Sequence, residues 1–254
     1  MSENIEASMP AVAFEQPATT ATAPKAGAPT IWEQLGGIFT EPVTLFQRLG
    51  THPRWGHALW AMFVIGWVMM TCWGLKVDVD AMQRPVLEQN ASLTASQIDQ
   101  AIAVSSRFIL PMSFVSVMIR NLLAVLGLGL VLWLFALTTD RKDKPSFLHA
   151  LSAATVPNLV LIPYTLMIAV VCMTRYVGGK IPERLAPSGL AYYLRPENPK
   201  VYGLLAQFDL FIIAYFVMLY LATRYTMRLK TSEATICTAI VVALSVGWKV
   251  YFWV

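Results

Sequence analysis

Long apolar runs separated by shorter polar segments divide this chain. A helix of about 20 apolar residues crosses a hydrocarbon core of about 30 Å, and five runs approach that length. The expected spans lie at 57–75, 121–138, 151–173, 204–223 and 234–254. The pattern therefore predicts an all-α, polytopic membrane protein: a five-helix bundle over 56–254, preceded by short amphipathic interfacial helices over 31–55.

The second apolar run, 108–137, is too long for one straight span. Arg120 and Asn121 divide it, so we expect a span over 121–138 and a continuous lead-in over 108–119. Whether this lead-in lies inside or outside the core is left open. Upstream, Thr94 and Gln97 have the spacing of a capping box and predict a short helix outside the core.

The chain before the first span has two parts. Residues 1–30 are rich in Ala, Pro and Thr and offer little apolar surface, so we expect a disordered cytoplasmic tail. From Ile31 onward, apolar residues recur at helical spacing, and Pro42 marks the first turn of a second short helix. Two amphipathic helices on the membrane face fit this pattern, although an apolar stripe would equally serve a partner-binding module.

The composition excludes several classes of protein. Of the 254 residues, 56% are hydrophobic and only 13% are charged, about half the charged share of roughly 25% in a soluble domain. A cytosolic enzyme, a secreted disulfide scaffold and a nucleic-acid-binding protein are therefore excluded. The bilayer is the expected partner, and nucleic acid is not.

The positive residues between spans predict the orientation. The net charge is +4, and the two short loops carry three Lys or Arg each. The two long loops carry three and five over about thirty residues apiece, a lower density near the span ends. We therefore expect a cytoplasmic N-terminus and, after five spans, a C-terminus outside.

Three ionisable residues fall within apolar runs: Arg120, Asp209 and Lys249. Such residues need a partner or a function, and all three are expected in the outer third of the bilayer. They could form an ion-coupled transport site or a clamp that joins three helices. The clamp is favoured, because transporters usually place their site near the midplane between two repeated halves.

No other residues form a recognisable site. Cys72, Cys172 and Cys237 lie in apolar runs without metal-ligand spacing, so no metal, cofactor or catalytic set is expected. Pro157 and Pro163 are expected to kink the third span.

Several local patterns carry a family resemblance. They begin with Phe39, Pro42, Phe46, Pro53 and Trp55 ahead of the first span. Further along are Ser146-Phe147 before the proline-containing third span, and Phe208-Asp209 at the start of the fourth. In this order, over residues 31–254, the chain resembles the bacterial branch of the Yip-domain (Ypt/Rab-interacting) family.

The resemblance implies a five-span protein of the bacterial inner membrane with a cytoplasmic N-terminus. Eukaryotic relatives act in vesicle trafficking and membrane shaping. Together with the missing catalytic motifs, this favours a non-enzymatic scaffold or adaptor, whose partners would be other membrane proteins or a second copy of the chain. The alternative is a small-solute or ion transporter or channel that uses Arg120, Asp209 and Lys249.

Overall fold

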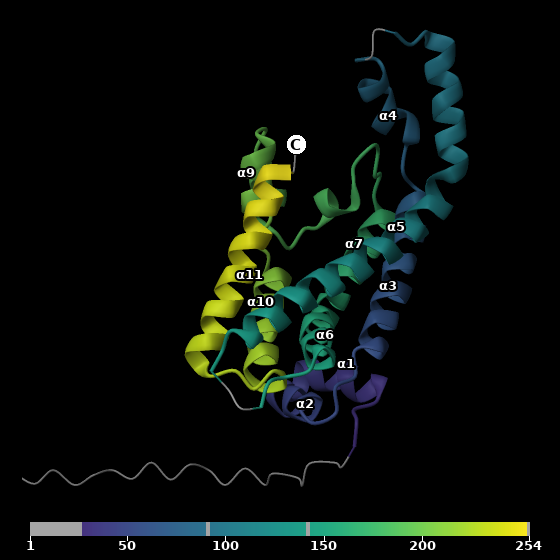
Figure 1. The fold of residues 1–254 in the computed structure, drawn as a ribbon. Helices are drawn as coiled ribbons and strands as arrows, with labels where there is room; N and C mark the ends of the chain where they lie inside the picture. Colours follow the sequence, from purple (N-terminus) through teal and green to yellow (C-terminus); the bar gives the residue numbers. More distant parts are fainter. Residues whose placement is uncertain (1–26, 90–91, 141–142, 253–254) are drawn as a thin grey trace, which may run out of the picture.

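The computed structural model describes residues 27–89, 92–140 and 143–252. Within these ranges the chain is built of helices, without a β-strand (Figure 1). Residues 1–26 of the expected tail lie outside the described residues, as do the last two residues of the expected fifth span. Residues 27–30 belong to the folded part, since Thr30 caps the first helix.

Four helices are long and apolar enough to cross a bilayer. They are α3 (Gly56–Gly74), α5 (Ala95–Leu137), the helical unit Phe147–Thr174 and α11 (Thr231–Phe252). Several apolar helices of this length indicate a multi-pass membrane protein. A shorter apolar helix covers Leu210–Thr226.

The helical unit Phe147–Thr174 changes its geometry midway. It consists of α6 (Phe147–Thr155), the 3₁₀ helix η1 (Val156–Leu161) and α7 (Ile162–Thr174). Pro157 lies in the first turn of η1 and Pro163 in the first turn of α7. Because proline has no N–H, α-helical bonding is interrupted there. The Asn158 side-chain amide donates to the carbonyls of Ala154 (2.8 Å) and Thr155 (3.2 Å) at the end of α6.

The second run forms one helix through Arg120 and Asn121, as expected of a lead-in that is continuous with its span. This helix begins at the expected capping box of Thr94 and Gln97 and continues for 43 residues. At a rise of about 1.5 Å per residue it is about 65 Å long, roughly twice the thickness of the core. It bends along its length (Figure 1) and contains Pro111. The expected short helix and the lead-in are therefore parts of one helix.

The fourth apolar run also differs from its expected bounds of 204–223. Here α9 (Pro199–Leu205) ends early in the run, and α10 (Leu210–Leu221) begins only after a break. The π-helix η3 (Ala222–Thr226) then extends α10. The break is explained by Asp209, whose side chain caps α10 and starts a new helix.

The two N-terminal helices pack against protein. The apolar side chains of α1 (Ile31–Thr40) and α2 (Pro42–Leu49) belong to the main core, with Ile38 and Phe46 fully buried. The Thr226 hydroxyl donates to the Phe46 carbonyl at 3.0 Å and joins α2 to η3. The structure thus does not confirm helices whose apolar faces lie in the membrane interface, since these faces are buried against the bundle instead.

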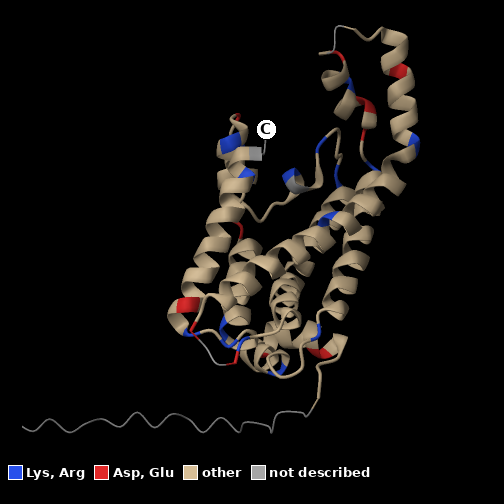
Figure 2. Cartoon of the chain, in the orientation of Figure 1, with Lys and Arg blue, Asp and Glu red and all other residues tan. Residues whose placement is uncertain are grey.

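The bundle has two different ends. The short-loop end comprises 27–55, 138–140, 143–146 and 227–230; the long-loop end comprises 75–89, 92–107 and 175–209 (Figure 2). At the long-loop end α4 (Val79–Leu87) packs beside α5, and η2 (Pro182–Leu185) and α8 (Leu190–Leu194) precede α9. A main core cluster includes α1, α2, α6, η1, η3 and part of α11, and a second includes Trp73, Ile168 and Val177 nearer the long-loop end.

Candidate functional site

The Asp209 carboxylate is bound by neutral donors. Only 2% of the residue is exposed, and its side chain accepts hydrogen bonds from the Phe211 N–H (2.8 Å) and from the Ser188 hydroxyl. Gly189 bridges to Asp209 through the backbone, and a Cβ at Gly189 would meet the carboxylate at 3.2 Å. Asp209 therefore caps α10 and holds the 188–189 segment against it.

The expected cluster of Arg120, Asp209 and Lys249 is not formed in the described part of the chain. The carboxylate makes no ion pair with either cation there. Arg120 lies within α5 and Lys249 in the last turn of α11, and each has a contact of its own. An N-cap aspartate receives backbone and hydroxyl donors locally and does not require a cation.

Arg120 lines a cavity inside the membrane-spanning part. The cavity is open, has a volume of about 190 Å³ and lies between α3, α5, η1 and α7. Asn121, Asn158, Tyr164 and Thr165 contribute further polar groups, whereas the walls from α3 are apolar. Of the three expected charges, Arg120 is thus the one that faces a polar cavity.

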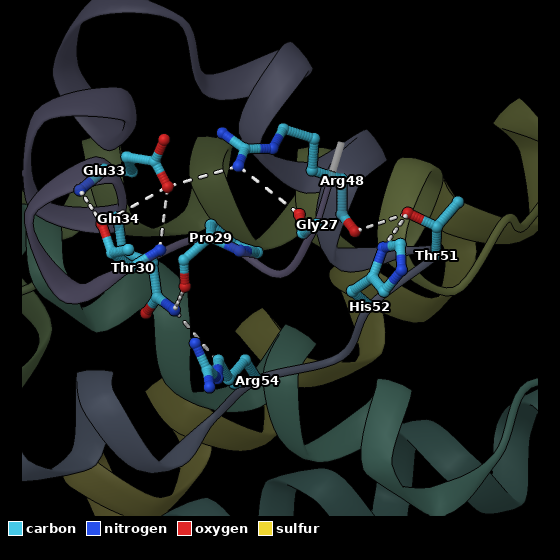
Figure 3. A network of polar contacts seen from close by, with 9 residues as sticks. All are labelled: Gly27, Pro29, Thr30, Glu33, Gln34, Arg48, Thr51, His52 and Arg54. Atoms are coloured by element: carbon cyan, nitrogen blue, oxygen red, sulfur yellow. Dashed lines mark hydrogen bonds and ion pairs between the residues drawn. The ribbon is translucent and has the colours of Figure 1, made fainter. Parts of the chain in front are cut away.

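A polar network ties α1 to α2 at the short-loop end (Figure 3). Thr30 and Glu33 form a capping box, and Arg48 from α2 reaches Glu33 at 3.2 Å. Gln34 is fully buried and donates to the backbone carbonyls of Pro29 (3.2 Å) and Arg54 (3.3 Å). The two helices and the segment leading to α3 are therefore connected by side chains as well as by the core.

These hydrogen bonds change the acidity of Glu33. Its pKa falls from 4.5 to about 2, first because the Thr30 N–H donates to the carboxylate and next because Arg48 does. The carboxylate is therefore ionised at neutral pH and matches the positive end of the α1 dipole.

The residues that carry the family resemblance have unlike surroundings. Phe46 is fully buried, whereas 54% of Phe39 is exposed. Pro42 lies at the start of α2, Pro53 is half-buried between α2 and α3, and Trp55 packs on the small cluster around Phe63. Four of the five thus have roles in folding this end of the chain, while Phe39 is exposed.

Sequence reasoning missed two polar residues near the candidate charges. Ser188 lies in a long loop, 21 residues before Asp209, and nothing in its local pattern indicates the contact. Asn158 lies beside Pro157, and the signal available was a polar amide next to a helix-breaking residue. Among the described residues, no group of three His, Cys, Asp or Glu could hold a metal ion.

Comparison with known proteins provides no relative. No protein-family model matches the chain, and neither do curated proteins or solved structures. The functional argument therefore depends on the geometry of this chain.

Proposed function

We propose that this protein is a non-enzymatic scaffold or adaptor of the bacterial inner membrane, a five-span bundle of Yip type with a cytoplasmic N-terminus. The fourth of the five spans would be Leu210–Thr226, with 12 α-helical residues followed by five of π-helix. At about 1.5 Å per residue it approaches 25 Å, which a slightly thinned bilayer accommodates. The short-loop end would then face the cytoplasm.

The proposal rests mainly on the exposed aromatic face of α1. Trp32 is 78% exposed and Phe39 54%, and they are seven residues apart, on one side of the helix. On the opposite side of α1, Gln34 and Ile38 are buried. A rigid helix that presents two large aromatic side chains is suited to bind another protein, because such anchors dominate interface energies.

The charge of α1 favours a partner helix over the lipid surface. Helices that bind anionic membranes carry many Lys and Arg on their polar face. Between Ile31 and Thr40 there is no basic residue, and Glu33 is acidic. The exposed face is also narrow, because Leu35 and Ile38, two other apolar residues of α1, pack in the main core or against it. We therefore propose an apolar helix of another membrane protein as the occupant.

Site-specific crosslinking tests the adaptor role. A photoreactive amino acid replaces Trp32 or Phe39 in the full chain, and exposed Trp60 on α3 serves as the control position. We expect one protein adduct from positions 32 and 39 in native membranes, and none of that partner from position 60. The double variant Trp32→Ala/Phe39→Ala should retain its thermal stability and lose at least about tenfold in partner recovery. Lipid adducts alone at 32 and 39 would overturn the proposal.

Cysteine accessibility tests the span count. Lys200→Cys and Lys230→Cys flank the shorter apolar helix on either side. If Leu210–Thr226 crosses the bilayer, an impermeant maleimide should label these two positions from opposite sides. Labelling of both from one side would leave four spans.

The polar cavity at Arg120 supports transport as the second candidate. In reconstituted vesicles, a transporter would show flux that Arg120→Gln removes and that Lys249→Gln preserves, because only Arg120 lines the cavity. A scaffold would show no flux in either form.

A further inference from the structure

A second and larger cavity lies at the long-loop end. It is open, has a volume of about 400 Å³ and is lined by the end of α7, the following segment, η2, α8 and α9. Four basic side chains line it: Arg175, Lys180, Arg184 and Arg195. Among the lining residues that the structure describes, none is acidic. The cavity is therefore strongly electropositive.

The four cations are not neutralised within the described chain. Its ion pairs involve Arg48 and Arg84, and the four cavity cations make no contact with a carboxylate. All four residues are exposed, so water screens the repulsion between them. Their common sign around one space nonetheless attracts an anion to it.

Aromatic side chains position two of the guanidinium groups. Arg184 lies over the ring of Tyr202 at 5.3 Å, and Arg195 over the ring of Tyr192 at 5.9 Å. A guanidinium stacked on an aromatic ring keeps the N–H groups in its plane available for a phosphate or carboxylate. Arg175 donates to the Tyr192 hydroxyl at 2.8 Å, so the hydroxyl hydrogen of Tyr192 is free to donate in turn.

The chain turns at Arg195, directly after α8. Its φ is 43° and its ψ 54°, the left-handed conformation, at the C-terminal cap of α8. Many helices end on a residue in this conformation. Here it turns the chain so that Arg195 and Tyr192 line the same cavity.

The cavity lies where a bilayer would meet its headgroups. Its wall begins at Val171, near the end of an apolar helix of membrane-spanning length. Two exposed tyrosines, Tyr176 (81%) and Tyr193 (68%), lie on the same segments, and tyrosine is enriched at this depth. We propose that this cavity binds a phosphate-bearing anion through Arg175, Arg184 and Arg195, with Tyr192 as an additional donor. The site does not depend on the proposed adaptor role.

Binding to the purified full chain tests the site. In neutral detergent, bound phosphatidylglycerol and phosphatidylcholine are counted by native mass spectrometry, and inorganic phosphate is titrated by calorimetry. The variant Arg184→Gln/Arg195→Gln removes two guanidinium groups, and Lys200→Gln removes an exposed cation outside the cavity. We expect the double variant to bind about tenfold more weakly, with Lys200→Gln unchanged. Thermal unfolding confirms that each variant is folded.

The two probes distinguish the source of the phosphate. The ligand is a lipid headgroup if wild type prefers phosphatidylglycerol to phosphatidylcholine, the double variant loses this preference, and inorganic phosphate does not bind. Binding of inorganic phosphate that the double variant loses identifies a free anion. The proposal is overturned if wild type and the double variant bind each probe equally well, or if wild type binds neither probe.

Discussion

The two ends of the bundle use their arginines differently. At the short-loop end Arg48 pairs with Glu33 at 3.2 Å, Arg224 donates to the Leu229 carbonyl at 2.6 Å, and Arg228 donates to the Gly50 carbonyl at 2.8 Å. These side chains connect loops to one another. Around the larger cavity at the long-loop end, four cations have no carboxylate partner in the described chain, and two of them, Arg184 and Arg195, stack on tyrosines.

A count of the positive residues in the loops therefore does not reveal what their side chains contact. Loop charges are commonly interpreted as orientation signals alone. In this chain the same charge closes the fold at one end and lines an open cavity at the other. The difference is set by what lies within reach: carbonyls and Glu33 at the short-loop end, and the rings of Tyr192 and Tyr202 at the larger cavity. It is a difference between two sites, because Arg84 at the long-loop end pairs with Asp80 and Asp99, and Arg224 at the short-loop end also lies over the Tyr225 ring.

The largest effect should come from removing the buried anchor of the short-loop end. Phe46→Ala leaves a cavity where α2 meets η3, and such a change in a core costs about 3–5 kcal/mol. The apparent unfolding temperature in detergent should fall markedly, while the exposed Phe39→Ala serves as the matched control and should leave it unchanged. If both variants behave alike, this end is not stabilised by its core.

An intermediate effect is expected at Asp209, which belongs to the long-loop end. Asp209→Ala removes the cap of α10 and should cost about 1–2 kcal/mol, whereas Asp209→Asn keeps an acceptor for the Phe211 N–H and should cost clearly less. Unfolding of both variants in urea measures the difference. A loss in Asp209→Asn as large as in Asp209→Ala would show that the negative charge of the carboxylate matters at this position.

The smallest effect is a local pH dependence at the short-loop end. Because folding lowers the pKa of Glu33 from 4.5 to about 2, its stabilising effect is complete above pH 4.5 and disappears as the pH falls toward 2. Amide exchange in α1, corrected for the intrinsic effect of pH, should accelerate over that window in wild type. Glu33→Gln should lack this acceleration. An identical pH profile in both proteins would exclude the Thr30–Glu33–Arg48 network as its source.

The apolar runs were the most readable part of the sequence. The structure has Gly56–Gly74 where the pattern predicts 57–75, and Phe147–Thr174 where it predicts 151–173. Length and hydropathy suffice for such helices, because the bilayer imposes both. Within 108–137 the lead-in and the span are continuous as predicted, but the same helix also includes the separate short helix predicted from Thr94, so its full length was not predicted.

The site was less readable because its contacts join distant segments. An aspartate in an apolar run suggests a buried ion pair, but Asp209 instead starts a helix and binds Ser188. The distinction depends on where α9 ends, and Gln207 and Phe208 give no strong stop signal. The larger cavity likewise assembles residues from 171 to 202, which only the folded loop brings together.

The length of α5 has a further consequence. A helix about 65 Å long exceeds a hydrocarbon core of about 30 Å, so in a bilayer part of α5 must lie beyond the core. We expect this part to be its first turns, where Arg84 from α4 bridges to Asp99 at 2.8 Å. Removing whole turns between 95 and 107 would then move α4 relative to the bilayer and leave the embedded helices in register.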